Sequence, residues 1–173
     1  ESLTNNKISV RSFPMIEVTI NKEMFFYCLN EFTIRSHIVT PFVLDVYIDE
    51  NHFETFWGDG LVVSTPTGSS AYNKSVNGAV IDPLIPCFQV AELASINSNE
   101  FRTLGSPFIL HQGRKLTLIP ARDENEHPIM ALDNEALSIQ HVDKIEIQLS
   151  EKRIQTAKIE DDSFWKTIRK IFL

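Results

Sequence analysis

Apolar and polar residues alternate with a period of two along most of this chain, and this pattern limits the fold more than any other feature. In residues 145–149, Ile145, Ile147 and Leu149 alternate with Glu146 and Gln148, so the apolar side chains share one face of an extended strand. Turn-forming residues separate many such runs, at a spacing of about 8–12 residues. This pattern favours two packed sheets over alternating strand–helix units. We expect strands at 15–20, 24–29, 32–36, 43–48, 52–56, 61–65, 89–95, 108–110, 115–120, 129–133, 136–140, 144–149 and 153–159.

Helical patterns occur in two segments only. A short helix is expected to open within the hydroxyl-rich residues 67–70 and to run to about residue 76, and a second is expected after Ser163 near the C-terminus. The apolar face of the second helix is formed by Phe164, Ile168 and Phe172. We expect this face to dock and to bury Trp165 partly. The predicted fold class is mainly β, a two-sheet β-sandwich of many short strands with these two helices.

Length and charge restrict the function. A chain of 173 residues fits one domain, and a formal net charge of -7 without a basic cluster argues against nucleic acid or an anionic membrane as partner. Cys28 and Cys87 lie among apolar residues, where buried structural thiols are expected. With no long apolar run and no signal-peptide pattern, the expected location is the cytoplasm. The first residues lack an initiator methionine and read as a linker within a longer protein, so we expect a fragment.

Residues 58–72, GDGLVVSTPTGSSAY, carry the strongest chemical signal. An apolar run leads into a hydroxyl-rich turn in which Pro66 fixes one backbone angle and Gly68 permits close approach. Ser and Thr hydroxyls both donate and accept hydrogen bonds, so such a turn can read a flat polar ligand such as a purine, and Tyr72 offers a ring for stacking. Composition alone favours an ordinary loop. The order of the residues favours a binding site.

That order closely resembles the Asp-Gly-apolar-Ser-Thr-Pro-Thr-Gly-Ser-Ser/Thr-Ala-Tyr signature of the NAD kinases. Residues 29–35 (LNEFTIR) are similar to the family's Asn-Glu segment, and residues 94–97 and 101–107 are similar to a loop-and-strand block of NAD kinases of Gram-positive type. Asp133 stands where the family usually has a late acidic residue. The resemblance runs in order over about residues 14 to 173. It implies that residues 1–173 are the C-terminal β-rich, NAD-binding and oligomerisation domain of an NAD kinase.

The resemblance also implies a set of NAD-binding residues. Asn30 and Glu31 would bind the adenosine ribose and adenine, and Asp59 would help to hold the nicotinamide end. The remaining implied contacts are Thr67, Ser70, Ala71, Tyr72, Asn73, Lys74 and Ser75 around the turn, Ala94 and Ile96 along the cleft, and Asp133 and Asn134 on the phosphate-proximal side. From the residues alone, Glu31 fits a ribose diol and a strand-edge salt bridge equally well, and an Asp between two glycines is more often a turn residue.

The chain lacks the Gly-Gly-Asp-Gly-Thr motif that NAD kinases carry in an N-terminal α/β domain, and Gly58-Asp59-Gly60 does not replace it. We therefore expect no catalytic residue here and no kinase activity of this chain alone. The full-length enzyme is expected to phosphorylate the 2′-hydroxyl of the adenosine ribose of NAD, giving NADP. Its phosphoryl donor would be ATP or polyphosphate, its cofactor a divalent cation such as magnesium, and its assembly a homo-oligomer, dimer or tetramer.

Two other functions are compatible with the sequence. One is the C-terminal domain of a related diacylglycerol or lipid-type kinase, and the other is a non-catalytic nucleotide-binding interaction module.

Three positions depart from the family pattern: Trp57 stands where Arg is frequent, Asn77 replaces a glycine, and Asn134 stands where His is common. Five histidines lack metal-ligand spacing, so no metal site is expected in this chain; they are His37, His52, His111, His127 and His141.

Overall fold

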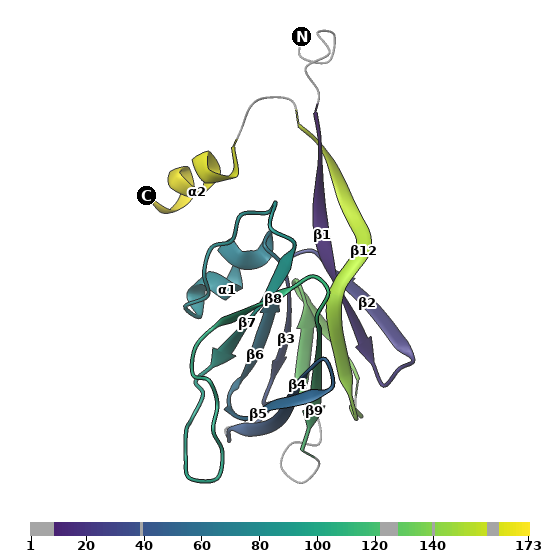
Figure 1. Cartoon of the computed structure of the whole chain (residues 1–173), viewed down its shortest axis with the longest axis vertical. Coiled ribbons are helices and arrows are strands. Elements are labelled where there is room, and N and C mark those ends of the chain that lie inside the picture. The colour runs from purple at the N-terminus through teal and green to yellow at the C-terminus, as the bar shows by residue number, and fades with distance from the viewer. Residues whose placement is uncertain (1–8, 39, 122–127, 140, 159–162) are drawn as a thin grey trace.

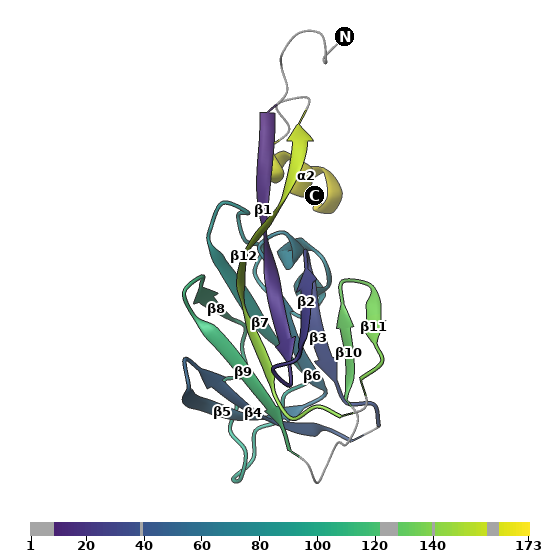
Figure 2. The same cartoon turned by 90° about the vertical axis from the view of Figure 1, so that its right-hand side faces the viewer.

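Two six-stranded antiparallel sheets pack against each other in a computed structural model that describes residues 9–38, 40–121, 128–139, 141–158 and 163–173 (Figures 1 and 2). The strand order is β2-β1-β12-β9-β4-β5 in the first sheet and β11-β10-β3-β6-β7-β8 in the second. The first sheet contains β1 (Ser9–Ile20), β2 (Met24–Cys28), β4 (Phe42–Ile48), β5 (Asn51–Gly58), β9 (Lys115–Pro120) and β12 (Ile145–Lys158). The second contains β3 (Glu31–Arg35), β6 (Gly60–Ser64), β7 (Cys87–Leu93), β8 (Phe108–His111), β10 (Ile129–Leu132) and β11 (Glu135–Leu137). The predicted two-sheet fold class is confirmed.

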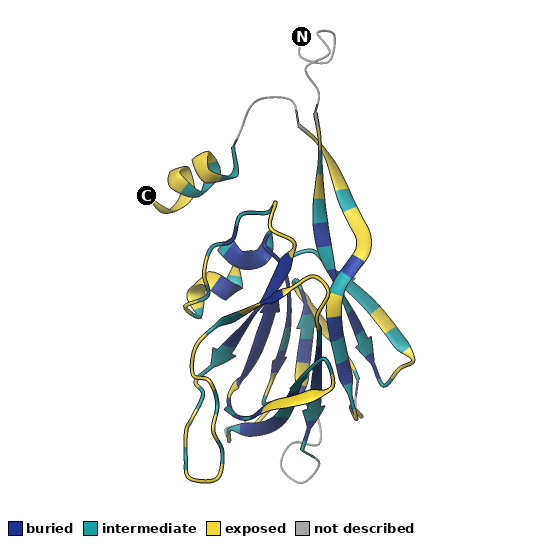
Figure 3. Ribbon diagram, in the orientation of Figure 1, coloured by how far each residue is buried: buried dark blue, intermediate teal, exposed yellow. Residues whose placement is uncertain are grey.

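The core lies between the two sheets and follows the predicted alternation (Figure 3). Ile16, Val18 and Ile20 of β1 are fully buried and face Phe32 and other residues of the second sheet within one apolar cluster. Every residue of β6 is buried, as expected for a central strand paired with β3 on one side and β7 on the other. Cys28 and Cys87 are buried free thiols, as predicted. Burial and the nearby charges of Asp133 and Glu31 raise the pKa of the Cys28 thiol.

β1 and β12 continue beyond the sandwich as a two-stranded arm (Figures 1 and 2). The prediction of two strands at 144–149 and 153–159 is wrong, because β12 is one strand, although residue 159 lies outside the described residues. Its pairing with β1 shifts where Pro14 faces Arg153 and Ile16 faces Leu149, which is a β-bulge rather than a turn. β11 is shorter than the predicted strand at 136–140, whose last residue is also outside the described part.

Both expected helical segments are present. A 3₁₀ turn, η1 (Gly68–Ser70), leads into α1 (Tyr72–Ser75), and α2 (Phe164–Phe172) begins after Ser163. No residue of α2 is buried, so its apolar face does not dock as expected. Contacts of the helix include a hydrogen bond from the Trp165 Nε1–H to Asp82 Oδ2 (2.9 Å) and the Lys74 ammonium, which lies 4.4 Å from the centre of the Phe172 ring. Trp165 is 49% exposed, so its predicted burial by a docked helix face is not observed. Within the described residues, no helix has the length and apolar character needed to cross a membrane.

Candidate functional site

The signature turn that follows β6 lies directly against the segment that precedes β3. The Thr65 N–H donates to the Asn30 carbonyl (2.9 Å), and the Thr65 hydroxyl donates to the Leu29 carbonyl (2.5 Å) while accepting the Gly68 N–H (3.1 Å). A Cβ on Gly68 would lie 2.1 Å from the Asn30 carbonyl oxygen, so only glycine fits at this crossing. Two motifs that are far apart in the sequence therefore form one site.

Asp133 fixes the backbone of this site from a third element, the turn between β10 and β11. Its Oδ1 accepts the N–H groups of Asn30 (2.7 Å) and Glu31 (3.2 Å), and its Oδ2 accepts that of Leu29 (3.1 Å). The Asp133 N–H donates to the Glu31 carbonyl (2.8 Å), and a left-handed backbone (φ 51°) allows the carboxylate to reach back. Asp133 thus shapes the Asn-Glu segment, and its predicted contact with a ligand stays a prediction.

Glu31 is the most unusual side chain of the site. It is 7% exposed, its Oε2 has no hydrogen-bond partner, and burial together with the Asp133 charge raises its pKa from 4.5 to about 7. The Thr67 hydroxyl and the Asn73 amide oxygen are also buried without a partner. Buried polar atoms in proteins are rarely unpaired. These three atoms are therefore candidates to pair with a bound polar group.

Polar residues beneath the turn hold its shape. The Ser69 hydroxyl donates to the Pro66 carbonyl (2.6 Å) and accepts the Ile81 N–H (2.8 Å), and the Asn73 amide donates to the carbonyls of Ser69 (3.3 Å) and Ala79 (3.4 Å). Gln89 of β7 receives the Ala79 N–H on its Oε1 (2.9 Å). Sequence reasoning assigned no role to Ser69 or Gln89: Ser69 lies within the signature, but nothing in the sequence marks Gln89.

Around this support, the other predicted residues of the turn lie nearer the surface. Ser70 and Tyr72 are half-buried, whereas Ala71, Lys74 and Ser75 are exposed, as is Asn134 beside Asp133. We call this set the Glu31 group; its members are Asn30, Glu31, Thr67, Ser70, Ala71, Tyr72, Asn73, Lys74, Ser75, Asp133 and Asn134. The predicted residues of this set therefore share one end of the second sheet.

The remaining predicted residues, Asp59, Ala94 and Ile96, lie at the opposite end of β6, and we call them the Asp59 group. The Asp59 side chain is exposed, while its N–H donates to the Leu93 carbonyl (2.9 Å). The Ile96 N–H donates to the Trp57 carbonyl (2.8 Å). Six residue steps along β6 separate Asp59 from Thr65, which corresponds to roughly 20 Å at ~3.3 Å per step. The structure therefore divides the predicted site residues into two groups.

Two of the departures from the family pattern have a local explanation. Asn77 adopts a left-handed backbone (φ 64°), a conformation that Asn tolerates better than most residues other than glycine. The Trp57 ring packs on Phe101, with ring centres 5.7 Å apart, and both rings line a cavity of about 620 Å³ beside the Asp59 group.

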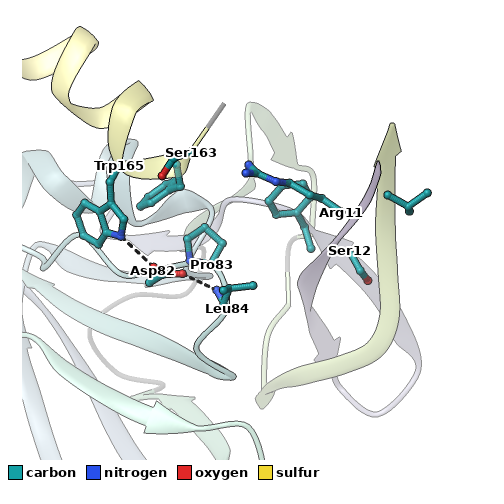
Figure 4. Close-up of a pocket in the computed structure, with 10 residues that line it drawn as sticks. Arg11, Ser12, Asp82, Pro83, Leu84, Ser163 and Trp165 are labelled. Carbon is teal, nitrogen blue, oxygen red and sulfur yellow. Dashed lines mark hydrogen bonds between the residues drawn. The ribbon is translucent and has the colours of Figure 1, made fainter. Parts of the chain in front are cut away.

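Another cavity, of about 410 Å³, lies between β1, residues 82–84 and the start of α2 (Figure 4). Asp82 sits at its centre and accepts hydrogen bonds from the Trp165 ring and from the Leu84 N–H (2.9 Å). None of the predicted NAD-binding residues lines it. Across the described residues, no group of three or more His, Cys, Asp or Glu side chains is placed to hold a metal ion.

Comparison with known proteins identifies the family of this chain. Residues 29–159 match the family model described as the ATP-NAD kinase C-terminal domain. The chain is 59% identical over 173 residues to NAD kinase 2 of Bacillus subtilis and 57% identical to NAD kinase 2 of Geobacillus kaustophilus, and in each case it spans 65% of the relative's length.

Solved structures share the fold. The chain superimposes on an NAD kinase from Archaeoglobus fulgidus in complex with ATP, with a TM-score of 0.72 and 23% identity, over 95% of this chain and 59% of that one. It also superimposes on yeast NADH kinase complexed with NADH, with a TM-score of 0.76 and 18% identity, over 93% of this chain and 49% of the yeast chain. Because the family model matches residues 29–159, which is most of the chain, the chain belongs to the ATP-NAD kinase family and corresponds to its C-terminal domain.

Proposed function

We propose that the full-length protein containing this chain is an NAD kinase, and that the chain is the part that binds NAD. The reaction transfers a phosphoryl group from ATP or polyphosphate to the 2′-hydroxyl of the adenosine ribose and yields NADP. Family membership and relatives named NAD kinase 2 support this activity. The observation that carries it is Glu31, a buried carboxylate whose unpartnered oxygen lies beside the backbone cradle of the signature turn.

The chemistry of the Glu31 group suits an adenosine. A ribose presents hydroxyl donors, which a carboxylate oxygen without a partner can accept. The Thr67 hydroxyl and the Asn73 amide oxygen add uncharged hydrogen-bonding atoms, and the half-buried Tyr72 ring offers a stacking surface. In this proposal, Asn30 and Glu31 hold the ribose and adenine, and the turn encloses them.

The separation of the two groups supports the proposal of a homo-oligomer, dimer or tetramer. An NAD molecule that touched both groups of one chain would have to run the length of β6, roughly 20 Å. The Asp59 group of a second copy could meet the same ligand without that constraint. Exposed apolar side chains of the loop at this end, Ile96 (38% exposed) and Leu104 (50%), provide surface that a second copy could cover.

Phosphoryl transfer requires a divalent cation, proposed to be magnesium, to neutralise phosphate charge. The described residues offer no carboxylate cluster for it. In this proposal the cation binds the nucleotide phosphates. The proposed location of the enzyme is the cytoplasm.

The test uses the full-length protein, a coupled assay for NADP formation and calorimetry with NAD. Glu31→Ala should weaken NAD binding by roughly 10- to 150-fold, the equivalent of about 1.5–3 kcal/mol for hydrogen bonds to a charged group. Glu151→Ala, an exposed carboxylate on the arm, is the matched control. Absence of NADP formation by the unsubstituted protein would refute the proposed activity, and unchanged NAD affinity of Glu31→Ala would refute the site.

A further inference from the structure

The loop at residues 94–107, which joins β7 to β8, is held by two carboxylates that come from different sheets (Figure 1, lower left). The Leu104 N–H donates to Glu54 Oε2 (2.7 Å), and the next N–H, that of Gly105, donates to both carboxylate oxygens of Glu92 (3.0 and 3.2 Å). Glu54 belongs to β5 at the edge of the first sheet, and Glu92 belongs to β7 of the second. The loop therefore bridges the two sheets at their open edge.

This anchor is connected to the part of the loop that carries the Asp59 group. The Thr103 N–H donates to the Asn97 side-chain oxygen (2.9 Å), which connects the second half of the loop to Asn97, the residue that follows Ile96. The Ile96 N–H is held in turn by the Trp57 carbonyl (2.8 Å). A short series of hydrogen bonds thus runs from the two carboxylates to the backbone beside Ile96.

The Glu54 carboxyl group lowers the stability of the fold at this position. It is 6% exposed, and its Oε1 is buried without a partner. Burial raises its pKa to about 7; the Leu104 N–H and His52 oppose this shift, and the Glu92 charge adds to it. A buried carboxyl group beside a second carboxylate costs folding free energy that an apolar residue would not. In the structure, this pair accepts hydrogen bonds from the Leu104 and Gly105 N–H groups.

We propose that Glu54 and Glu92 are positioning residues, which fix the 94–107 loop and so hold Ala94 and Ile96 where they contact the dinucleotide. The inference rests on the proposed function, because it assumes that the Asp59 group binds NAD. The two carboxylates themselves touch neither the substrate nor the reacting atoms. They act by raising the fraction of molecules whose loop is ready to bind, and apparent affinity scales with that fraction.

The first experiment measures steady-state kinetics and NAD binding of the full-length enzyme. In Glu92→Ala and Glu54→Leu, loss of the acceptor should raise KM and Kd for NAD about fivefold, as for a loop that is correctly placed a fifth of the time. The kcat and the KM for the phosphoryl donor should stay unchanged. Glu54→Gln and Glu92→Gln retain an acceptor oxygen and should restore NAD affinity. Glu17→Ala, on β1 away from the loop, is the control.

A double-mutant cycle then asks whether Glu92 acts through Ile96. Ile96→Ala removes the larger of the two loop side chains that contact NAD, so adding Glu92→Ala should then weaken NAD binding less than it does in the unsubstituted enzyme, and the two effects should be non-additive. Additive effects would overturn the inference, and so would unchanged NAD affinity in both Glu92→Ala and Glu54→Leu. If the unsubstituted enzyme itself failed to bind NAD, the proposed function and this inference would both be refuted.

Discussion

Replacing Glu31 with glutamine should stabilise the domain at alkaline pH and change its stability little at pH 5. In the folded chain, burial and the neighbouring Asp133 charge raise the pKa of Glu31 from 4.5 to about 7. Between these two values the folded state keeps a proton that the unfolded state releases, so the free energy of unfolding falls as the pH rises. At about 1.4 kcal/mol per pH unit, the loss amounts to at most about 3 kcal/mol above pH 7. Glutamine cannot ionise, so Glu31→Gln removes this loss.

Urea unfolding of the 173-residue chain at pH 5, 6, 7 and 8 measures the effect. Glu54 has the same elevated pKa, so it should contribute a second decline over the same pH range. Each single Gln variant should therefore flatten part of the pH dependence, and the double variant should flatten most of it. Glu17→Gln, a half-buried residue of β1, serves as the control. A stability curve of Glu31→Gln that runs parallel to that of the unsubstituted chain would show that Glu31 is already ionised in the folded state.

Three further predictions concern the backbone of the site and the role of the chain. Asp133→Ala should lower the free energy of unfolding by about 3 kcal/mol, because three amides lose a charged acceptor, and Asp133→Asn should cost less; urea unfolding decides. Gly68→Ala should displace the signature turn and abolish NAD binding by the full-length protein in calorimetry, since its Cβ would meet the Asn30 carbonyl at 2.1 Å. Gly113→Ala, where the nearest atom is 3.5 Å away, should bind NAD normally. This chain alone should show only background activity in an NADPH-coupled assay, and robust magnesium-dependent NADP formation would contradict that expectation.

The two-sheet fold could be predicted because burial here repeats with the period of a strand. Ile16 and Val18 of β1, like Ile145 and Ile147 of β12, are buried at alternate positions, and this signal is local. The continuity of β12 could not be predicted in the same way. The predicted strands end at residue 149 and begin again at 153, but β12 continues through residues 150–152, where its pairing with β1 shifts register. The partner strand lies more than a hundred residues away, so no local pattern marks this continuity.

The same difference between local and non-local signals decides which parts of the candidate site could be predicted. The turn after β6 could be located because its proline, glycine and hydroxyl residues are contiguous. The role of Asp133 as an acceptor for the amides of residues 29–31 could not, because its partners lie more than a hundred positions away. The contact of Glu54 with Leu104 is likewise non-local, and an acidic residue within a strand carries no sign that it will be buried.

β6 fixes the distance between the two groups of predicted site residues. Its ladder pairs Glu31 with Ser64 on the β3 side and Leu93 with Gly60 on the β7 side, so both groups are tied to one register. A slip of one residue would move Leu61 and Val63 out of the apolar core and bring Ser64 toward it, which the packing between the sheets does not tolerate. The spacing of the groups is therefore rigid. Changes in ligand preference must then come from the turn at residues 65–75 and from the 94–107 loop, whose position depends on Glu54 and Glu92 rather than on the core.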